Sequence, residues 1–247
     1  MSLRSDNPYG RPRRYESRQL DVRVDDRVAV TPRMWELRLR GPALGMVRAA
    51  KAGAHVRVEV PVANSAPVSR TYSVWAQDAA TASLVLRVVD HVPGGPGSRW
   101  AASASIGQRL RISLPHNKIS LEPTAPYHVF VGEETGAVPL LAMVAALPRA
   151  APVFGALETV DAESELAVPS GRAVEWVHRG AASAVNSPVL LRAVRQLELP
   201  DRPGVAYVAG ESATCRAVAR YLVNERGWPR AAVRRQTHWT SGQYGLL

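Results

Sequence analysis

The hydrophobic pattern changes near residue 124, and this change constrains the fold more than any other feature of the 247-residue sequence. Before that point, segments such as LDVRVDDRVAV and AHVRVEVPV alternate apolar and polar residues, as strands with one buried face do. About six short strands of this kind are separated by turns containing Gly, Pro, Asn or Asp. The first half of the chain is therefore predicted to form a closed antiparallel β-barrel.

The second half alternates continuous apolar strands with helices. YHVFVGEE, APVFGALE, RAVEWVHRG and GVAYVAGE are the four predicted strands, and VPLLAMVAALP is a predicted helix with Pro139 in its first turn. Alternation of strand and helix is typical of a doubly wound α/β domain. We expect a loose lead-in over residues 1–18, a barrel domain over 19–124 and an α/β domain over 125–247.

Charge and cysteine content narrow the possible functions. The formal net charge is +10, which favours an anionic partner, but the sequence has no zinc-finger spacing and no RNP-like motif. We therefore expect a small anionic molecule rather than nucleic acid. Cys215 is the single cysteine, so an internal disulfide and a cysteine metal cluster are excluded. The histidines lack the i, i+4 spacing of a zinc site, and no protein metal site is expected.

No stretch approaches the ~20 apolar residues that a membrane helix needs. The first residues also lack the apolar core of a secretory signal. We expect a cytoplasmic protein, as a monomer or a homodimer.

The stretch SRTYSVW, residues 69–75, contains the first residues that could bind a ligand. On a strand, Arg70 and Tyr72 share one face, and Thr71 and Ser73 share the other. An arginine can pair with phosphate, and an aromatic ring beside it can pack on a flat group. The alternative is a barrel edge strand with solvated polar residues. The pattern is compatible with a flat, phosphorylated ligand.

A second stretch, HVPGGPGSRWA, begins at His91 and contains Gly95-Pro96-Gly97-Ser98 and Trp100. Glycine allows the backbone to approach a ligand closely, and free N–H groups at a helix start favour an anion. The alternative is an ordinary turn between strand and helix. Such a turn explains the glycines but leaves the Ser-x-Trp spacing unexplained.

In this order the two stretches resemble the siderophore-interacting protein family, FAD-dependent ferric-siderophore reductases with the barrel-then-α/β order of ferredoxin-reductase-like flavoproteins. The resemblance extends over residues ~20 to 245, with an R-x-Y-[ST] strand and a histidine followed by a G-P-A-S-x-W-A segment, whose places are taken here by His91 and GPGSRWA. The other matching segments are Gly132–Pro139, Val174–Arg179, Ala209-Gly210-Glu211 and Glu225-Arg226-Gly227.

The resemblance implies a bound FAD, with FMN a less favoured alternative, and NADPH or NADH as the electron donor. The flavin would do the chemistry, so no side chain is required as an acid or base. The implied cofactor-binding residues are Arg70, Thr71, Tyr72, Ser73, His91, Gly95, Pro96, Gly97, Ser98, Trp100 and Thr135. The implied substrate and nicotinamide pocket contains Trp75, Glu134, Gly210, Glu211, His238 and Trp239.

The sequence also departs from the family pattern. Trp75 and Thr240 stand where the family often has arginine, and the loss of arginine at 240 removes one candidate contact to an anionic substrate. No G-x-G-x-x-G follows the first strand of the second half, and Glu133 and Glu134 would repel a pyrophosphate at that helix start. Nicotinamide dinucleotide binding is therefore less firmly indicated than flavin binding.

Three functions remain open at this point. The first is reduction of a ferric siderophore with electrons from NAD(P)H through FAD. The second is a flavin-dependent tailoring reaction in secondary-metabolite biosynthesis, with Trp75 and Trp239 as an apolar wall for an organic substrate. The third is a binding protein that keeps the fold without turnover.

Overall fold

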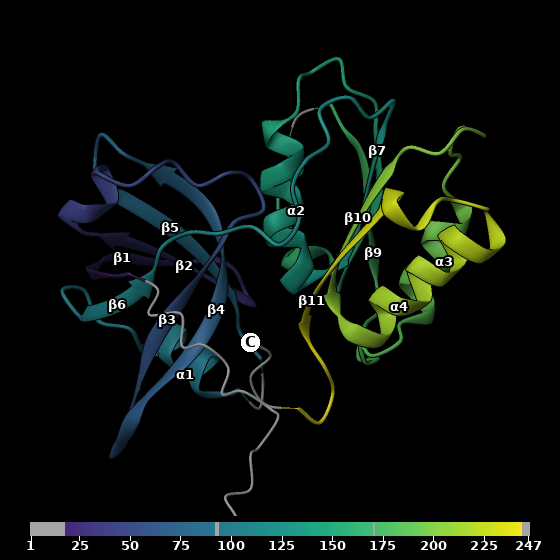
Figure 1. Cartoon of the computed structure of the whole chain (residues 1–247). Coiled ribbons are helices and arrows are strands. Elements are labelled where there is room, and N and C mark those ends of the chain that lie inside the picture. Colours follow the sequence, from purple (N-terminus) through teal and green to yellow (C-terminus); the bar gives the residue numbers. More distant parts are fainter. Residues whose placement is uncertain (1–17, 92–93, 170, 244–247) are drawn as a thin grey trace, which may run out of the picture.

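The computed structural model describes residues 18–91, 94–169 and 171–243. Two units lie side by side, a barrel and an α/β unit (Figure 1). The predicted lead-in lies almost wholly outside the described residues, as do residues 92 and 93 of the glycine-rich stretch. The exact division at residues 124 and 125 stays a prediction.

The barrel is a closed antiparallel sheet with the strand order β1-β2-β5-β4-β3-β6. Alternate residues point inward and form a continuous apolar core that includes Leu37, Val58, Leu86 and Ile112. A short helix, α1 (Pro96–Ser103), packs on the barrel and inserts Trp100 into this core. The strands are β1 (Gln19–Thr31), β2 (Met34–Arg40), β3 (His55–Val62), β4 (Ser65–Asp78), β5 (Ser83–Val89) and β6 (Arg109–Ser113).

The second unit is a parallel five-stranded sheet with the order β11-β10-β7-β8-β9. Helix α2 covers the face toward the barrel, and α3 and α4 cover the other face (Figure 1). The strands are β7 (His128–Glu133), β8 (Val153–Thr159), β9 (Ala173–His178), β10 (Val205–Glu211) and β11 (Val233–Trp239). The helices are α2 (Glu134–Ala146), α3 (Pro188–Gln196) and α4 (Ser212–Arg220), and single helical turns lie at Pro42–Gly45, Ala162–Ser164, Tyr221–Glu225 and Arg230–Ala232.

The two units share an apolar contact region. Met34 and Val89 of the barrel are buried in the same cluster as Leu140 and Val144 of α2. Trp75 packs against this cluster from β4. The contact fixes the start of α2 opposite β4, the strand that carries the R-x-Y-S stretch.

The predicted fold class, an antiparallel barrel followed by a doubly wound α/β unit, is confirmed. Two details of the prediction are wrong. The helix α2 begins at Glu134 rather than near Val138, because the Glu133 side chain caps it, so Pro139 lies inside the helix. The strand β11 was not predicted, because VRRQTHW is an edge strand with several polar residues and lacks the apolar run of a central strand. Among the described residues, no helix is both long enough and apolar enough to span a membrane.

Candidate functional site

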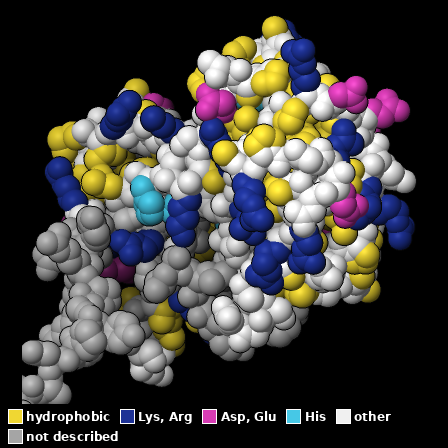
Figure 2. Space-filling model, turned by 45° about the vertical axis from the view of Figure 1, so that its right-hand side comes forward, with side chains coloured by type: hydrophobic (Ala, Val, Ile, Leu, Met, Phe, Trp, Pro, Cys, Tyr) yellow, Lys and Arg dark blue, Asp and Glu magenta, His cyan; other side chains and the backbone are white. Residues whose placement is uncertain are grey.

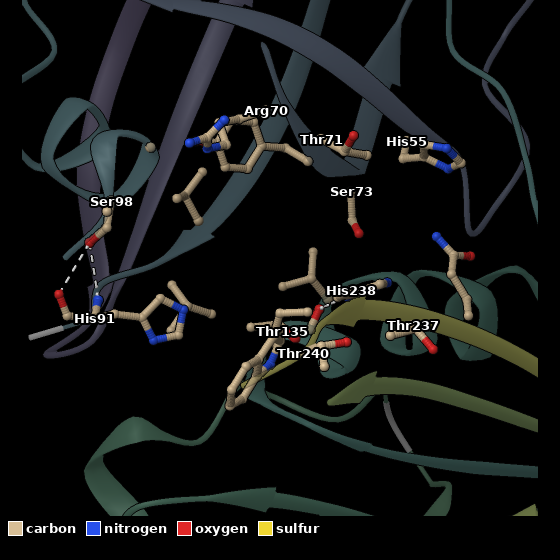
Figure 3. A pocket seen from close by; sticks show the side chains of 18 of the residues that line it. His55, Arg70, Thr71, Ser73, His91, Ser98, Thr135, Thr237, His238 and Thr240 are labelled. Atoms are coloured by element: carbon tan, nitrogen blue, oxygen red, sulfur yellow. Dashed lines mark hydrogen bonds between the residues drawn. The ribbon is translucent and has the colours of Figure 1, made fainter. Parts of the chain in front are cut away.

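A cavity of about 690 Å³ lies where the barrel meets the α/β unit (Figure 3). Strands β3, β4 and β5 and the start of α1 form one wall, and the start of α2 and the end of β11 form the other. Twelve of the predicted site residues line it: Arg70, Thr71, Tyr72, Ser73, His91, Gly95, Pro96, Gly97, Ser98, Thr135, His238 and Trp239. The fold therefore brings together stretches that are far apart in the sequence.

The cavity is basic. Arg70, Arg87 and Lys118 line it, and none of its described lining residues is acidic. On the face of the molecule in Figure 2, Lys and Arg side chains are spread over both units and Asp and Glu are fewer. Both features favour an anionic ligand.

The two stretches singled out in the sequence meet at Tyr72 and Gly97. A Cβ on Gly97 would lie 2.1 Å from the Tyr72 hydroxyl oxygen, so only glycine fits here without movement. The Tyr72 hydroxyl is buried and has no hydrogen-bond partner among the described residues, and burial raises its pKa. The start of α1 carries no side-chain cap, since its N-cap residue is Gly95. The backbone N–H groups in the first turn of α1 therefore have neither a helical acceptor nor a side-chain acceptor among the described residues.

Ser98 acts within the loop rather than toward a ligand. Its hydroxyl oxygen accepts a hydrogen bond from the backbone N–H of His91 at 3.0 Å (Figure 3) and donates its hydrogen to Oδ1 of Asp90 at 2.7 Å. A hydroxyl has one hydrogen to donate, and here Asp90 takes it. Ser98 thus ties the start of α1 to Asp90 and His91, the residues that follow β5.

Trp100 does not line the cavity, contrary to the expectation that it contacts the cofactor. It is 4% exposed in the barrel core, and its indole N–H donates to Oε1 of Gln108 at 3.2 Å. Its ring centroid lies 5.8 Å from that of Tyr72. Trp100 therefore supports Tyr72 from behind.

The expected wall at Trp75 is also corrected. Trp75 is absent from the cavity lining, because the guanidinium carbon of Arg87 lies 3.7 Å from its ring centroid and covers it. Arg87 also pairs with Glu36, with Nε and Oε2 2.8 Å apart. The cavity is therefore lined here by the guanidinium group of Arg87 rather than by an apolar ring.

On the opposite wall, His238 is tied to the start of α2. Pro139 has no N–H, so it cannot make the usual helical bond to the carbonyl oxygen of Thr135. The His238 Nδ1 atom lies 3.1 Å from that oxygen and donates to it. Burial is the main reason that the pKa of His238 is lowered to about 4, so its ring is neutral at pH 7.

Trp239 separates this cavity from a second one of about 340 Å³. Its indole N–H donates to Oε1 of Glu133 at 3.1 Å. The second cavity also contains Arg33, Glu134, Arg179 and the loop 180–184, and it shares His91 and Trp239 with the first. Glu134, predicted for a nicotinamide pocket, lies here.

Glu134 makes a buried ion pair with Arg179, whose Nη1 atom is 2.6 Å from Oε2 of Glu134. Gly210 and Glu211 line neither cavity among the described residues. Glu211 instead caps α4, and a Cβ on Gly210 would lie 2.5 Å from Oε1 of Glu133. These two residues shape the end of β10 rather than a pocket wall.

Several cavity residues were missed by the sequence analysis. His55 is a single histidine within a strand pattern, yet it lines the cavity with its ring centroid 3.9 Å from that of His116. Its burial, followed by the nearby His116, lowers its pKa to about 3. Lys118 is one of two lysines in an arginine-rich chain, which is a faint signal, whereas Arg87 and Gln236 gave none.

The cavity fits a flavin dinucleotide. Arg70 and the uncapped start of α1 suit its phosphates, and the lining contains no described carboxylate that would repel them. Four buried polar atoms of the lining residues have no hydrogen-bond partner in the described chain: His55 Nδ1, Tyr72 Oη, Gln236 Oε1 and His238 Nε2. Buried polar groups are usually paired, so such a cluster indicates a place for a polar ligand.

The fold and this cavity define a flavin-dependent oxidoreductase of the ferredoxin-reductase-like class. A family model described as siderophore-interacting FAD-binding domain matches residues 57–119, and one described as siderophore-interacting protein matches residues 125–242. The chain belongs to the siderophore-interacting protein family, and FAD is the cofactor that its barrel domain supports.

Similar proteins agree with this assignment. A siderophore utilization protein from T. fusca has a TM-score of 0.83 at 27% identity, with 94% of this chain and 96% of that chain covered. Phthalate dioxygenase reductase has a TM-score of 0.67 at 22% identity, with 89% and 68% covered, and shows the fold alone. An uncharacterised Mycobacterium tuberculosis protein is 28% identical over 180 residues, which is 68% of this chain. The chain spans 63% of that relative's length.

Proposed function

We propose that the protein reduces ferric siderophores with electrons from NADPH or NADH, which pass through FAD. The observation that carries this proposal is the basic cavity beside the R-x-Y-S strand, with Arg70, Arg87 and Lys118 and no described acidic residue in its lining. Many ferric siderophores are anionic, and a basic cavity attracts and holds an anion. The family assignment and the siderophore utilization protein of T. fusca support the same substrate class.

Residues of both walls have distinct roles in this proposal. Arg70 and the N–H groups at the start of α1 bind the FAD phosphates, and Tyr72 packs beside the flavin. Ser73 lies on the barrel wall of the cavity (Figure 3) and offers its hydroxyl group to the cofactor, whereas the Thr135 hydroxyl on the opposite wall donates its hydrogen to Glu133. The cations Arg87 and Lys118 hold the ferric chelate near it.

Bound FAD supplies two-electron acceptance from a nicotinamide and one-electron donation to iron. Overall, one NAD(P)H and two ferric chelates give NAD(P)⁺, one proton and two ferrous chelates, so charge and electrons balance. Electron transfer to the chelate needs proximity rather than an acid or base. This explains why the cavity requires positioning groups and not a catalytic side chain.

The test is anaerobic turnover of FAD-loaded protein. NADPH or NADH is added with a hydroxamate, catecholate or carboxylate ferric siderophore, and Fe(II) is followed with a ferrous-specific chelator. We expect Fe(II) production that requires the FAD, a donor and the siderophore together. Absence of Fe(II) with both donors and all three chelate classes would refute the proposal.

One observation favours a second candidate, a flavin-dependent tailoring reaction on an organic substrate. Thr240, Ser241 and Gln243 make the end of the cavity lining neutral, where the family pattern places an arginine. Thr240→Arg separates the two functions. It should raise affinity for an anionic ferric chelate if the reductase proposal holds, and lower the rate with a neutral organic substrate if the tailoring proposal holds.

A further inference from the structure

The helices of the parallel sheet are capped by the protein's own side chains. Oε2 of Glu133 accepts from the N–H of Thr135 at the start of α2, at 2.9 Å. Glu211 accepts from the N–H groups of Ala213 and Thr214 at the start of α4, at 2.9 and 2.7 Å. At the start of α3, Ser187 Oγ accepts from the N–H of Leu190 at 3.1 Å. Dinucleotide-binding sheets place a pyrophosphate at such a helix end.

Moving the side chain of Glu133 or Glu211 aside to admit a phosphate would cost free energy. Glu133 and Glu211 are each 1% exposed. Glu133 also accepts from the Trp239 indole N–H at 3.1 Å, and Glu211 from the N–H of Asn186 at 3.2 Å. Displacement would leave a buried carboxyl group without its donors, and the Glu211 carboxylate would also repel a phosphate.

The glycines of the turn before α2 are used for packing. A Cβ on Gly132 would lie 2.5 Å from the carbonyl oxygen of Ala209, and a Cβ on Gly136 would lie 2.1 Å from the same oxygen. These glycines allow β7 and α2 to approach β10. They do not open the backbone to a ligand, which is the other use of glycine in such a turn.

The second cavity lies beside these helix ends and beyond Trp239. Its volume of about 340 Å³ is at the lower end of small-molecule sites, which suits a nicotinamide ring with its ribose better than a whole dinucleotide. Trp239 and His91 line both cavities, so a ring bound here lies next to the larger cavity.

We propose that the nicotinamide donor is recognised through its nicotinamide–ribose end in the second cavity, and that the helix ends of the sheet bind none of its phosphates. This inference rests on the proposed use of NADPH or NADH. It predicts that the adenosine half of the donor adds little to recognition, so NADH and NADPH are equivalent.

The first test compares NADPH, NADH and reduced nicotinamide mononucleotide, which lacks the adenosine half. Anaerobic stopped-flow mixing with the FAD-loaded protein gives a second-order rate constant from the loss of flavin absorbance. We expect the three rate constants to agree within about threefold. A rate constant for NADPH or NADH that exceeds that of either other compound by more than about tenfold would overturn the inference. Absence of flavin reduction by all three would instead refute the proposed donor and so the proposed function.

A binding measurement provides a readout that does not depend on turnover. Calorimetric titration of the FAD-loaded protein with nicotinamide mononucleotide should show binding, and titration with ADP-ribose or 2′-phospho-ADP-ribose should show none at the same concentration. Tighter binding of either adenosine compound than of the mononucleotide would overturn the inference.

Two variants locate the contact. Arg216 is an exposed cation on α4 whose guanidinium contacts the Ser212 hydroxyl at the helix start, where a cation could pair with a 2′-phosphate. Arg216→Ala should leave the NADPH-to-NADH rate ratio within about twofold of the original, and a selective loss with NADPH would overturn the inference. Trp239→Ala alters the wall between the cavities and should change all three rate constants by a similar factor. A change limited to the dinucleotides would also overturn it.

Discussion

The barrel and the α/β unit each contain helices, and the starts of these helices are capped differently. The start of α1 has glycine as its N-cap, no side-chain cap and a position on the main cavity. The starts of α2 and α4 are filled by the buried carboxylates of Glu133 and Glu211. The helix end available to an anion therefore belongs to the barrel. A doubly wound sheet alone does not indicate a dinucleotide phosphate site, because the cap residue decides whether the helix end is free.

The largest effect should come from closing the open end of α1. Gly97→Val places side-chain atoms on the Tyr72 hydroxyl, whose oxygen would lie 2.1 Å from the new Cβ, so α1 or Tyr72 must move. We expect the Kd for FAD to rise about a hundredfold, measured by flavin fluorescence titration. Gly95→Ala is the control for the steric effect, because its Cβ meets no protein atom within 4 Å, and the melting temperature should fall only by the small cost of alanine at an N-cap. FAD affinity equal to that of the original protein in Gly97→Val would contradict the assignment of this end to the cofactor.

Arg70 should distinguish phosphate recognition from ring recognition. Arg70→Ala should raise the Kd for FAD about thirtyfold, because charge-assisted hydrogen bonds to phosphate are lost. The Kd for riboflavin, which has no phosphate, should stay within about twofold. Arg111→Ala is a matched control, since Arg111 is 58% exposed and pairs with Glu59 away from the cavity lining. Equal losses for FAD and riboflavin would show that Arg70 does not contact the phosphates.

Removing a cap from the α/β unit should affect stability and not the cofactor. Glu211→Ala frees the N–H groups of Ala213 and Thr214, and we expect the free energy of unfolding to fall by about 1–2 kcal/mol in urea denaturation. The Kd for FAD should not change. A loss of FAD affinity as large as that expected for Arg70→Ala would contradict the proposal that only the start of α1 binds the cofactor.

The smallest effect concerns pH. The lowered pKa values of His55 and His238, about 3 and about 4, mean that between pH 6.5 and 4 the unfolded chain binds protons that the folded protein does not. The free energy of unfolding therefore falls as pH falls. Burial, followed by the nearby Glu134, raises the pKa of Glu133 to about 7, so the folded protein holds a proton between pH 7 and 4.5 that the unfolded chain lacks. This effect opposes that of the histidines.

Glu133→Gln removes the opposing contribution. The free energy of unfolding should then depend more steeply on pH between about 5 and 6.5, by up to about 1.4 kcal/mol per pH unit. His238→Asn should make the dependence shallower. Urea denaturation at several pH values checks both variants, and an unchanged slope in Glu133→Gln would show that the buried carboxyl does not hold this proton.

Much of the architecture could be predicted from local patterns. Alternation with period two in the first half, and apolar runs separated by helices in the second, were sufficient for the fold class. The strand β11 escaped prediction because edge strands carry polar residues that resemble a loop. The start of α2 escaped because a glutamate rather than Ser, Thr, Asp or Asn caps it.

The candidate site was predictable only in part. The stretches with Arg70 and Gly97 were identified from glycine and charge patterns, and they line one cavity. Trp75 and Trp100 were misplaced, because an aromatic residue in a short motif packs against a ligand or against the core with equal ease. His55 was missed because one histidine in a strand carries no information about what faces it across the fold.

The sequence by itself determined the two-unit architecture, the basic character and the resemblance to flavin-binding proteins, because periodicity, charge and short motifs are local properties of the chain. Only the tertiary structure decided which helix ends are open, since a cap is made by hydrogen bonds at definite distances. It also decided that Arg87 covers Trp75 and that His238 bonds to the carbonyl left free by Pro139. These contacts join residues from different elements, and no pattern along the chain records them.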